Sequence, residues 1–302
     1  MSINLPNDGS GKTPMFGVPL FGGRKLPMGR TLVMGILNVT NDSFYAQSRA
    51  ADERDAVSRA LSMARAGADA LDIGAESTRP GSRGIQAETE REVLTPVIGA
   101  IRRELPDMPL SADTRHAIAA SAAIEAGADI INDVSGLGLP DEAPAMMSLL
   151  SETGAAYVLT HTKGTPDVMQ RAPVYGDLIS EIRTFFDEKI RALKSAGVPR
   201  EKLIIDPGIG FGKRASDNLT LLANVEKFFS FGLPVLVGAS RKRFIGNIAG
   251  GAAKDDPAER LEGTLAITSL CAVAGVNIVR VHDVSANRRT VDMIEAIARH
   301  RL

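Results

Sequence analysis

Short apolar runs recur along the chain, and stretches with helical spacing separate them. The eight runs are Leu32–Leu37, Ala70–Ile73, Leu110–Ala112, Asp129–Ile131, Ala156–Thr160, Leu203–Ile205, Pro234–Val237 and Asn277–Val281. Runs this short, continuously apolar and followed by turn residues are typical of strands that are buried on both faces of a parallel sheet. The pattern therefore predicts eight buried strands.

Helical patterns lie between these runs. Four predicted helices are Ala56–Ala66, Ala117–Ala126, Glu181–Ser195 and Leu261–Ala274. The third is the clearest, because its apolar residues recur at helical spacing: Ile182, Phe185, Phe186, Ile190 and Leu193. The fourth places Cys271, the only cysteine, among apolar neighbours, where we expect it to pack in the core and not to act as a nucleophile.

Strand and helix alternating eight times predicts an α/β fold with a parallel sheet, closed as a single-domain (β/α)₈ TIM barrel. A doubly wound open sheet is the alternative, but Gly208–Gly212 lacks the spacing of a dinucleotide-binding loop. The segment Phe16–Leu26 carries two adjacent glycines between apolar residues, which predicts a hairpin closing the bottom of the barrel. We expect residues 1–15 to be a flexible N-terminal segment and residues 16–302 to form the barrel.

Composition narrows the class of protein. Of 302 residues, 44% are hydrophobic and 24% are charged, as in soluble globular proteins, and the net charge of −1 gives no general basis for binding nucleic acid or a membrane. The start of the chain lacks the apolar stretch of a secretory signal, and no apolar run approaches the roughly 20 residues of a membrane span. We expect a cytoplasmic protein.

Every predicted strand ends in a polar or ionisable group. In chain order these are Asn38, Asp72, Asp113, Asn132, His161, Asp206, the segment Ser240–Lys242, and Arg280 with His282. In a barrel the carboxyl ends of the strands converge on one face, where enzymes of this architecture carry their active sites. One polar strand end is uninformative, since turns favour Asp, Asn and Ser, but eight together predict a site.

Several of these residues have a second interpretation. Asp72 is as well explained by a buried supporting or capping role as by ligand contact, and His161 is as well explained by a structural role as by that of a base. Asp113 could cap the following helix instead of contacting a ligand, and Asn132 is ambiguous in the same way. Asp206 is the strongest candidate, because Pro207 and Gly208 end the strand abruptly, and a buried carboxylate there needs a partner such as Lys242.

The cations follow the last two strands. Loops after strands seven and eight are a frequent phosphate-binding corner of such barrels, which favours Lys242, Arg280 and His282 as an anion site. Arg241 and Arg243 are also consistent with a solvated basic turn. Asn38 offers an uncharged oxygen that suits Mg²⁺, which takes few protein ligands beside phosphate oxygens and waters.

Six motifs together resemble the dihydropteroate synthase family, in the family's order and over nearly the whole chain after residue 15. They are Met34–Phe44, Gly74–Gly81, Asn132–Gly136, Asp206–Phe211, Ser240–Phe244 and Arg280–Asp283. The resemblance implies a transferase of folate biosynthesis, a sulfonamide target that joins 6-hydroxymethyl-7,8-dihydropterin diphosphate to p-aminobenzoate in an SN1-like displacement. It also implies a requirement for Mg²⁺ and a homodimer.

The resemblance also implies roles for individual residues. Those implied for the pterin are Asp113, Asn132, Asp206 and Lys242, and those for the diphosphate are Asn38, Arg280 and His282, with Asn38 also at the metal. Those implied for p-aminobenzoate are Phe44, Thr78, Arg79, Pro80, Ser240 and Arg243. Catalysis would then depend on Asp113, Lys242 and Arg280, which stabilise charge while the site positions two substrates.

The chain departs from the family's pattern in its loops. Asn41 and Ala46 replace a proline and a loop carboxylate that are common in the family, Ala75 replaces a glycine, and the segment Thr160–Lys163 differs as well. These changes leave open a degenerate paralogue that binds pterin without turnover. A pterin-binding methyltransferase is a further alternative. Such an enzyme binds no diphosphate, so Arg280 and His282 argue against it.

Overall fold

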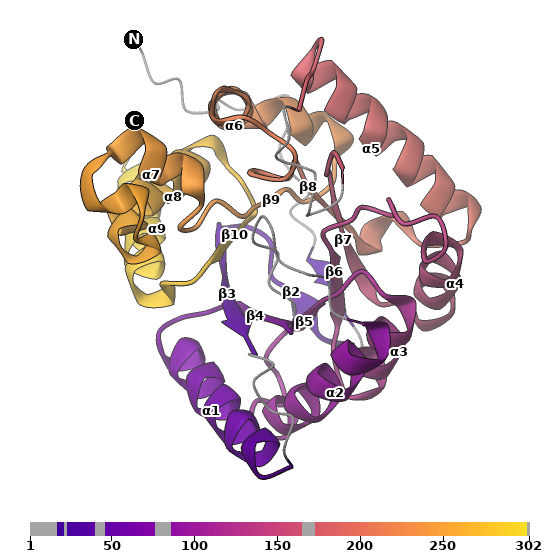
Figure 1. Ribbon diagram of the computed structural model, residues 1–302. Helices are drawn as coiled ribbons and strands as arrows, with labels where there is room; N and C mark the ends of the chain where they lie inside the picture. The colour runs from indigo at the N-terminus through magenta and orange to yellow at the C-terminus, as the bar shows by residue number, and fades with distance from the viewer. Residues whose placement is uncertain (1–16, 21–22, 40–45, 76–85, 165–172, 301–302) are drawn as a thin grey trace.

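The chain folds as a barrel of eight parallel strands surrounded by helices (Figure 1). The computed structural model describes residues 17–20, 23–39, 46–75, 86–164 and 173–300. The barrel strands are β3 Leu32–Asn38, β4 Ala70–Gly74, β5 Leu110–Asp113, β6 Ile130–Asp133, β7 Ala156–Thr160, β8 Leu203–Asp206, β9 Leu236–Val237 and β10 Ile278–Val281. Their order is β8-β7-β6-β5-β4-β3-β10-β9, and a parallel bridge between Ile205 and Val235 closes the ring. The predicted barrel is confirmed and the open sheet is excluded.

The helices alternate with these strands and cover the outside of the barrel (Figure 1). They are α1 Ala46–Arg65, α2 Ala87–Glu104, α3 Ala117–Glu125, α4 Ala143–Thr153, α5 Leu178–Ser195, α6 Ala215–Ala223, α7 Arg243–Ala249, α8 Leu261–Ala274 and α9 Val284–Ala298. Short 3₁₀ helices occupy Arg200–Lys202, Val225–Phe231, Gly251–Lys254 and Pro257–Arg260. The predicted bounds of α8 are exact, whereas α1 starts ten residues before the predicted helix.

Side chains alternate between the inside and the outside of the barrel along each strand. Tyr157 and Leu159 of β7, for example, join the apolar layer between strands and helices, while Ala156 and Val158 join a separate cluster inside the barrel. This period of two is a property of extended backbone. It decides which strand-end residues can meet inside the barrel.

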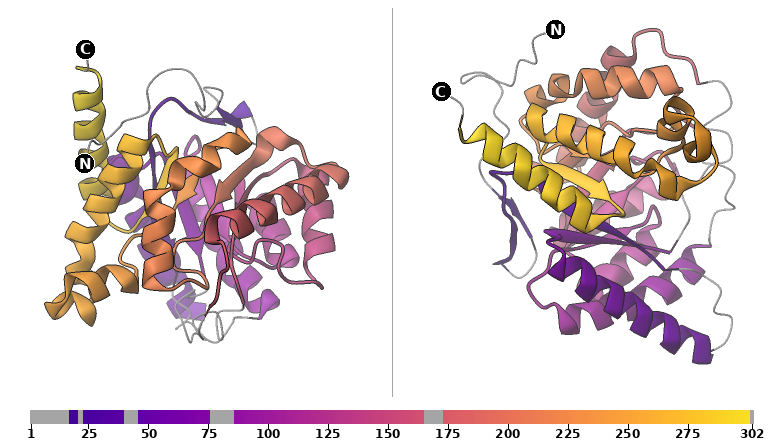
Figure 2. Two further views of the ribbon diagram at one scale, coloured as in Figure 1. Left: turned by 90° about the horizontal axis from the view of Figure 1, so that it is seen from above. Right: turned by 90° about the vertical axis from the view of Figure 1, so that its left-hand side faces the viewer.

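The N-terminal segment forms the predicted hairpin. Strands β1 (Val18–Pro19) and β2 (Lys25–Leu26) pair antiparallel, with Val18 opposite Leu26. Val18 and Leu26 belong to the same apolar cluster as inward residues of the barrel such as Ile204 and Ile278. The hairpin therefore closes one end of the barrel, which is the end away from the carboxyl termini of the strands (Figure 2).

A buried carboxylate fastens the hairpin to the barrel. Asp129, just before β6, is fully buried and accepts hydrogen bonds from Arg24 of the hairpin and Arg102 of α2, each with a closest distance of 2.6 Å. The same carboxylate accepts from the backbone N–H of Leu110 at 3.0 Å. Because Asp129 has three donors around it, its charge is compensated inside the protein, and three separate segments are held together.

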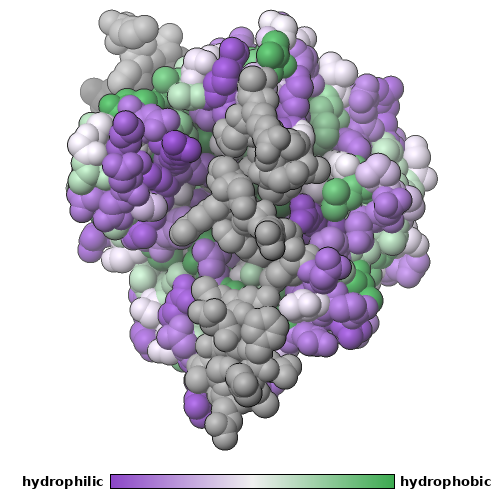
Figure 3. Space-filling model, in the orientation of Figure 1, coloured by the Kyte–Doolittle hydropathy of each residue, from purple (hydrophilic) through white to green (hydrophobic). Residues whose placement is uncertain are grey.

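One face of the molecule can be judged by its hydropathy (Figure 3). On the face seen in Figure 3, hydrophilic residues predominate and apolar residues occur in small scattered groups. In the part of the chain that the structure describes, no helix is both long enough and apolar enough to cross a membrane.

We predict that Asp129→Ala destabilises the protein by about 3 kcal/mol, because it leaves Arg24 and Arg102 without their buried partner. Urea unfolding followed by circular dichroism measures this change. Glu53→Ala is the matched control, since Glu53 is partly exposed and its contact with Arg103 is 3.7 Å long, so we expect a loss of about 0.5 kcal/mol or less. Similar losses for the two variants would contradict an anchoring role for Asp129.

Candidate active site at the carboxyl ends of the strands

The alternation along the strands directs a set of polar side chains into the barrel at the carboxyl ends. The apolar residue before each of these positions belongs to the outer layer, so the alternation places them inward: Asp72, Ser111, Asp113, Asn132, Thr160, Asp206 and Arg280. Asp133 and His161, one position further along their strands, face outward. Asp133 accepts from the Tyr157 hydroxyl at 2.6 Å, which makes it structural.

Arg280 of β10 joins two of the carboxylates. Its Nε donates to Asp72 Oδ2 at 2.5 Å, and a terminal guanidinium nitrogen donates to Asp113 Oδ2 at 2.6 Å. Burial acts to lower the pKa of Arg280, but Asp72 and Asp113 outweigh it and the pKa is raised. The predicted Asp113 and Arg280 are thus in direct contact, and Asp72 is the group that supports them.

Asn132 is oriented by the same carboxylate. Its side-chain nitrogen donates to Asp72 Oδ2 at 3.0 Å. An amide oxygen facing a carboxylate would be repelled, so Asp72 fixes which end of the amide is which. The Asn132 oxygen is left as an acceptor on the side away from Asp72.

Asp206 ends β8 and is fixed by the loop that follows. The backbone N–H of Gly208 donates to Asp206 Oδ1 at 2.7 Å. Gly208 has φ +73°, and a Cβ there would lie 1.9 Å from the backbone oxygen of His161, so only glycine fits. Burial raises the pKa of the Asp206 carboxyl, while Lys242, the Gly208 hydrogen bond, Lys213 and Arg280 oppose the rise.

Lys242 lies across the same loop. The sequence favoured a direct pair with Asp206, but Lys242 Nζ instead donates to the backbone oxygen of Ile209 and lies 4.0 Å from the centroid of the Phe211 ring. Burial lowers its pKa to about 8, against the opposing charge of Asp206. The two groups therefore interact through their charges across the loop.

A strained turn after β9 presents Lys242. Arg241 has φ +57°, an uncommon conformation for a residue with a side chain. Its guanidinium pairs with Asp283 at 2.9 and 2.5 Å, and its backbone N–H donates to the hydroxyl of Thr264 at 3.1 Å. Arg260 donates to the backbone oxygen of Arg241 at 2.9 Å. Arg241 is therefore a structural residue, and Arg260, which the sequence interpretation missed, supports it.

Three further predicted residues, Ser240, Arg243 and His282, lie at or beside this turn, whereas Asn38 lies at the end of β3. Ser240 is buried, and its hydroxyl is 3.0 Å from His282 Nδ1 and accepts from the His282 backbone N–H at 3.2 Å. Arg243 is exposed as the first residue of α7. Asn38 is exposed at the end of β3, where its backbone oxygen accepts from Arg59 at 3.1 Å.

His161 is not a base in this site. It faces outward, its ring meets Phe185 edge to face with centroids 4.9 Å apart, and its Nδ1 is 2.9 Å from Nζ of Lys213. Burial, with Lys213 adding to it, lowers its pKa to about 2. Burial thus keeps the imidazole neutral, and its outward packing supports the structural interpretation of His161.

Three inward oxygen atoms have no hydrogen-bond partner among the residues that the structure describes. They are Asp72 Oδ1, Ser111 Oγ and Thr160 Oγ1, and all three residues are fully buried. Buried polar atoms are nearly always paired with protein, water or ligand. Ser111 and Thr160 were missed from the sequence, although their inward position follows once the strand register is known.

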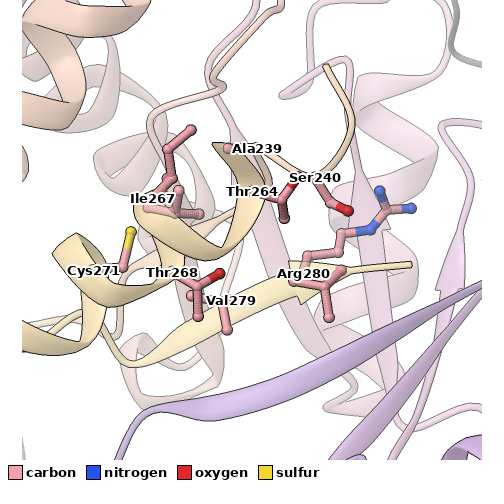
Figure 4. A pocket seen from close by; sticks show the side chains of 10 residues that line it. Ala239, Ser240, Thr264, Ile267, Thr268, Cys271, Val279 and Arg280 are labelled. Atoms are coloured by element: carbon pink, nitrogen blue, oxygen red, sulfur yellow. The ribbon is translucent and has the colours of Figure 1, made fainter. Parts of the chain in front are cut away.

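A small cavity lies behind the site, between β9, β10 and α8 (Figure 4). Its volume of about 10 Å³ has room for at most about one water molecule, so it is not the ligand site. Cys271 lines it and is fully buried; burial raises its pKa to about 12, as expected for a core cysteine. The Arg280 guanidinium points away from Cys271, towards Asp72 and Asp113 (Figure 4).

Four predicted residues, Phe44, Thr78, Arg79 and Pro80, lie outside the described residues, as does Asn41. Across ranges 17–20, 23–39, 46–75, 86–164 and 173–300, no three His, Cys, Asp or Glu side chains form a group that could hold a metal ion. A metal here would therefore depend on ligands such as the Asn38 oxygen together with substrate and water oxygens.

Comparisons with known proteins identify the architecture. Residues 34–282 match the family described as "Pterin binding enzyme". The dihydropteroate synthase of Synechocystis is 42% identical over 89% of this chain and 91% of its own length. The solved Yersinia pestis dihydropteroate synthase with a sulfonamide drug is 36% identical, with a TM-score of 0.86 over 94% of this chain and all of the other. The Xanthomonas albilineans dihydropteroate synthase with 4-aminobenzoic acid is 38% identical, with a TM-score of 0.83 over 93% and 98% of the two chains. The chain belongs to the dihydropteroate synthase family of pterin-binding enzymes.

Proposed function

We propose that this chain joins 6-hydroxymethyl-7,8-dihydropterin diphosphate to p-aminobenzoate at the inward-facing polar set, releasing 7,8-dihydropteroate and diphosphate. The observation that carries the proposal is the convergence of Asp113, Asn132, Asp206 and Arg280 on inward positions at the carboxyl ends of four strands. The p-aminobenzoate bound by the Xanthomonas relative supports the second substrate.

The pterin would be recognised by hydrogen bonds of matched polarity. Asp206 accepts from the two adjacent N–H groups of the aminopyrimidinone edge, a charge-assisted pairing with geometric selectivity. Asn132, oriented by Asp72, contributes its amide oxygen, and Lys242 donates to the ring oxygen or nitrogen. The unpartnered oxygens of Ser111 and Thr160 are suited to ligand or water donors.

The diphosphate would lie near the end of the last barrel strand, against Arg280 and His282. Asn38 fits a Mg²⁺ ion there, because its exposed amide supplies an oxygen ligand and the rest of the coordination comes from diphosphate and water. When bound, Mg²⁺ would neutralise charge on the leaving diphosphate.

The reaction needs no covalent enzyme nucleophile. The bond between the pterin methylene and the diphosphate oxygen breaks with its electron pair on the diphosphate, and positive charge spreads into the electron-rich pterin ring. Asp113 favours that charge, while Arg280 stabilises the anion that leaves. The p-aminobenzoate nitrogen then bonds to the methylene and releases a proton to solvent. Ser240 and Arg243 would hold this substrate, together with the residues that the family resemblance implies for it: Phe44, Thr78, Arg79 and Pro80.

We also propose that the chain forms a homodimer, as its resemblance to the dihydropteroate synthase family implies. Helices α8 and α9 expose Leu270, Met293 and Ile297, which are 42%, 62% and 58% accessible. Exposed apolar side chains of this size on two adjacent helices support a second copy packing on this face. Light scattering of the purified protein measures its mass in solution.

The direct test supplies the pterin diphosphate to the purified protein with and without p-aminobenzoate and with and without Mg²⁺. We expect diphosphate release and 7,8-dihydropteroate formation only when both substrates and Mg²⁺ are present. Tight pterin binding without turnover would instead identify a degenerate paralogue, and reversion of Asn41 to Pro and Ala46 to Asp would then be the next experiment.

We predict that kcat/KM falls as the pH rises through about 8, the value to which burial lowers the pKa of Lys242. The ammonium is the donor, so its contribution is present below that pKa and is lost above it. Lys242→Arg should remove this basic limb, because a guanidinium keeps its charge, while Lys194→Arg on the exposed face of α5 should leave it unchanged. A basic limb retained in Lys242→Arg would exclude Lys242 as its source.

We predict that Arg280→Lys lowers kcat/KM by about 100-fold or more, because a lysine is a point charge and cannot bridge Asp72 and Asp113. Calorimetry should show that affinity for the pterin diphosphate falls further than affinity for 7,8-dihydropteroate. Arg191→Lys, at an exposed position of α5, is the control. Equal losses for both ligands would make Arg280 a purely structural residue.

A further inference from the structure

Lys213 is a buried lysine with no role in the proposed reaction. It follows the loop after β8 and is only 2% accessible, so a substrate cannot reach it. Its Nζ lies 2.9 Å from His161 Nδ1, 3.2 Å from the His161 backbone oxygen and 3.0 Å from the Phe211 backbone oxygen. Burial of an ionisable amine is costly, so the protein needs a compensating reason to keep it there.

Two of the three neighbours of Lys213 Nζ are backbone carbonyl oxygens, which can only accept. The third, His161 Nδ1, is an acceptor in the tautomer that carries the ring proton on Nε2. Three acceptors match the three N–H bonds of an ammonium, whereas a neutral amine has only two to offer. Burial lowers the pKa of Lys213, with Asp206 as the strongest opposing influence, and the acceptor geometry favours the charged form.

Lys213 lies beside the backbone segments that hold Asp206. The His161 backbone N–H donates to the Asp206 backbone oxygen at 2.9 Å, and the His161 oxygen accepts from Lys213. A Cβ on Gly208, whose N–H binds the Asp206 carboxylate, would lie 3.3 Å from Lys213 Nζ. The loop that holds the Asp206 carboxylate is therefore in contact with the Lys213 ammonium.

The formal charges of the site balance only when Lys213 is counted. Asp72, Asp113 and Asp206 carry three negative charges, and Arg280, Lys242 and Lys213 carry three positive ones. Arg280 contacts both Asp72 and Asp113 but carries one charge against their two, so the two lysines near the Asp206 loop balance Asp206 and the remaining negative charge. Without Lys213 the site carries one uncompensated negative charge.

We propose that Lys213 is a positioning residue for the pterin site: it is the buried counter-cation that keeps Asp206 ionised and holds the loop from Pro207 to Gly212 in its binding shape. This inference rests on the proposed role of Asp206 as the pterin acceptor. The charged groups that face Asp206 are Lys242 after β9, Arg280 on β10 and Lys213 itself, while His161, just after β7, is neutral.

The test compares Lys213→Met with Lys227→Met at an exposed position. Methionine keeps a long, unbranched side chain but has no charge and no hydrogen-bond donor. Binding of 7,8-dihydropteroate is measured by calorimetry across pH. Since binding needs ionised Asp206, it is lost as the pH falls through the pKa of that group. In Lys213→Met we expect this loss about one pH unit higher and affinity about tenfold weaker at pH 7, with Lys227→Met unchanged.

A double-mutant cycle separates this role from simple packing. Urea unfolding of Lys213→Met, Asp206→Asn and the double variant should show a coupling of about tenfold or more in the unfolding equilibrium constant. Asp206→Asn should restore part of the stability that Lys213→Met removes. If Lys213→Met fails to fold alone, it should fold in the Asp206→Asn background.

Three results would overturn the inference: an unchanged pH dependence in folded Lys213→Met, additive effects in the cycle, or failure of Lys213→Met to fold in both backgrounds. The cycle reads stability alone, so it decides the inference even when the wild-type protein fails to bind 7,8-dihydropteroate. That last failure would count against the proposed function and not against the pairing of Lys213 with Asp206.

Discussion

The contact of Arg280 with Asp72 and Asp113 inside the barrel is the constraint on which the rest of the site depends. Each of these charges is expensive to remove from water, and each is tolerated because the others are in place. Asp72, which has no access to solvent, also orients Asn132. A residue that the sequence left ambiguous thus organises two residues that the sequence favoured. Removal of Arg280 would leave two buried carboxylates without their common cation.

The residues that stabilise the barrel and the residues of the proposed site lie towards opposite ends of its axis. At the end closed by the β1–β2 hairpin, inward positions are apolar, as with Ile204 and Ile278, and Asp129 ties the hairpin to the barrel from outside that core. At the other end, the next inward positions on the same two strands are Asp206 and Arg280. A step of two residues along each strand therefore leads from the apolar core to the charged site. The apolar half stabilises the strands that hold the polar half in register.

The loops after β8 and β9 control the charge of Asp206 from two sides. Lys213 supports the loop from behind, and Lys242 crosses it from the front on a turn whose unusual backbone is held by Asp283, Thr264 and Arg260. Catalysis by positioning and electrostatics requires such rigidity, because the site must be polar before the substrate arrives. The buried residues around the loops are therefore part of how this family member would bind its pterin.

The sequence by itself determined the eight strands, their parallel order and the chemistry at their ends, because these depend on local patterns: apolar runs, glycine stops and short motifs. Asp113, Asn132, Asp206 and Arg280 were predicted in this way as residues at the strand ends. The tertiary structure alone decided which groups meet. Arg280 and Asp72 are 208 residues apart, and nothing local shows that they pair. It also decided that His161 faces outward to Lys213 while Asp206 faces inward. A shift of one residue in the end of a strand reverses the direction of a side chain, and only the closed, packed barrel sets that register.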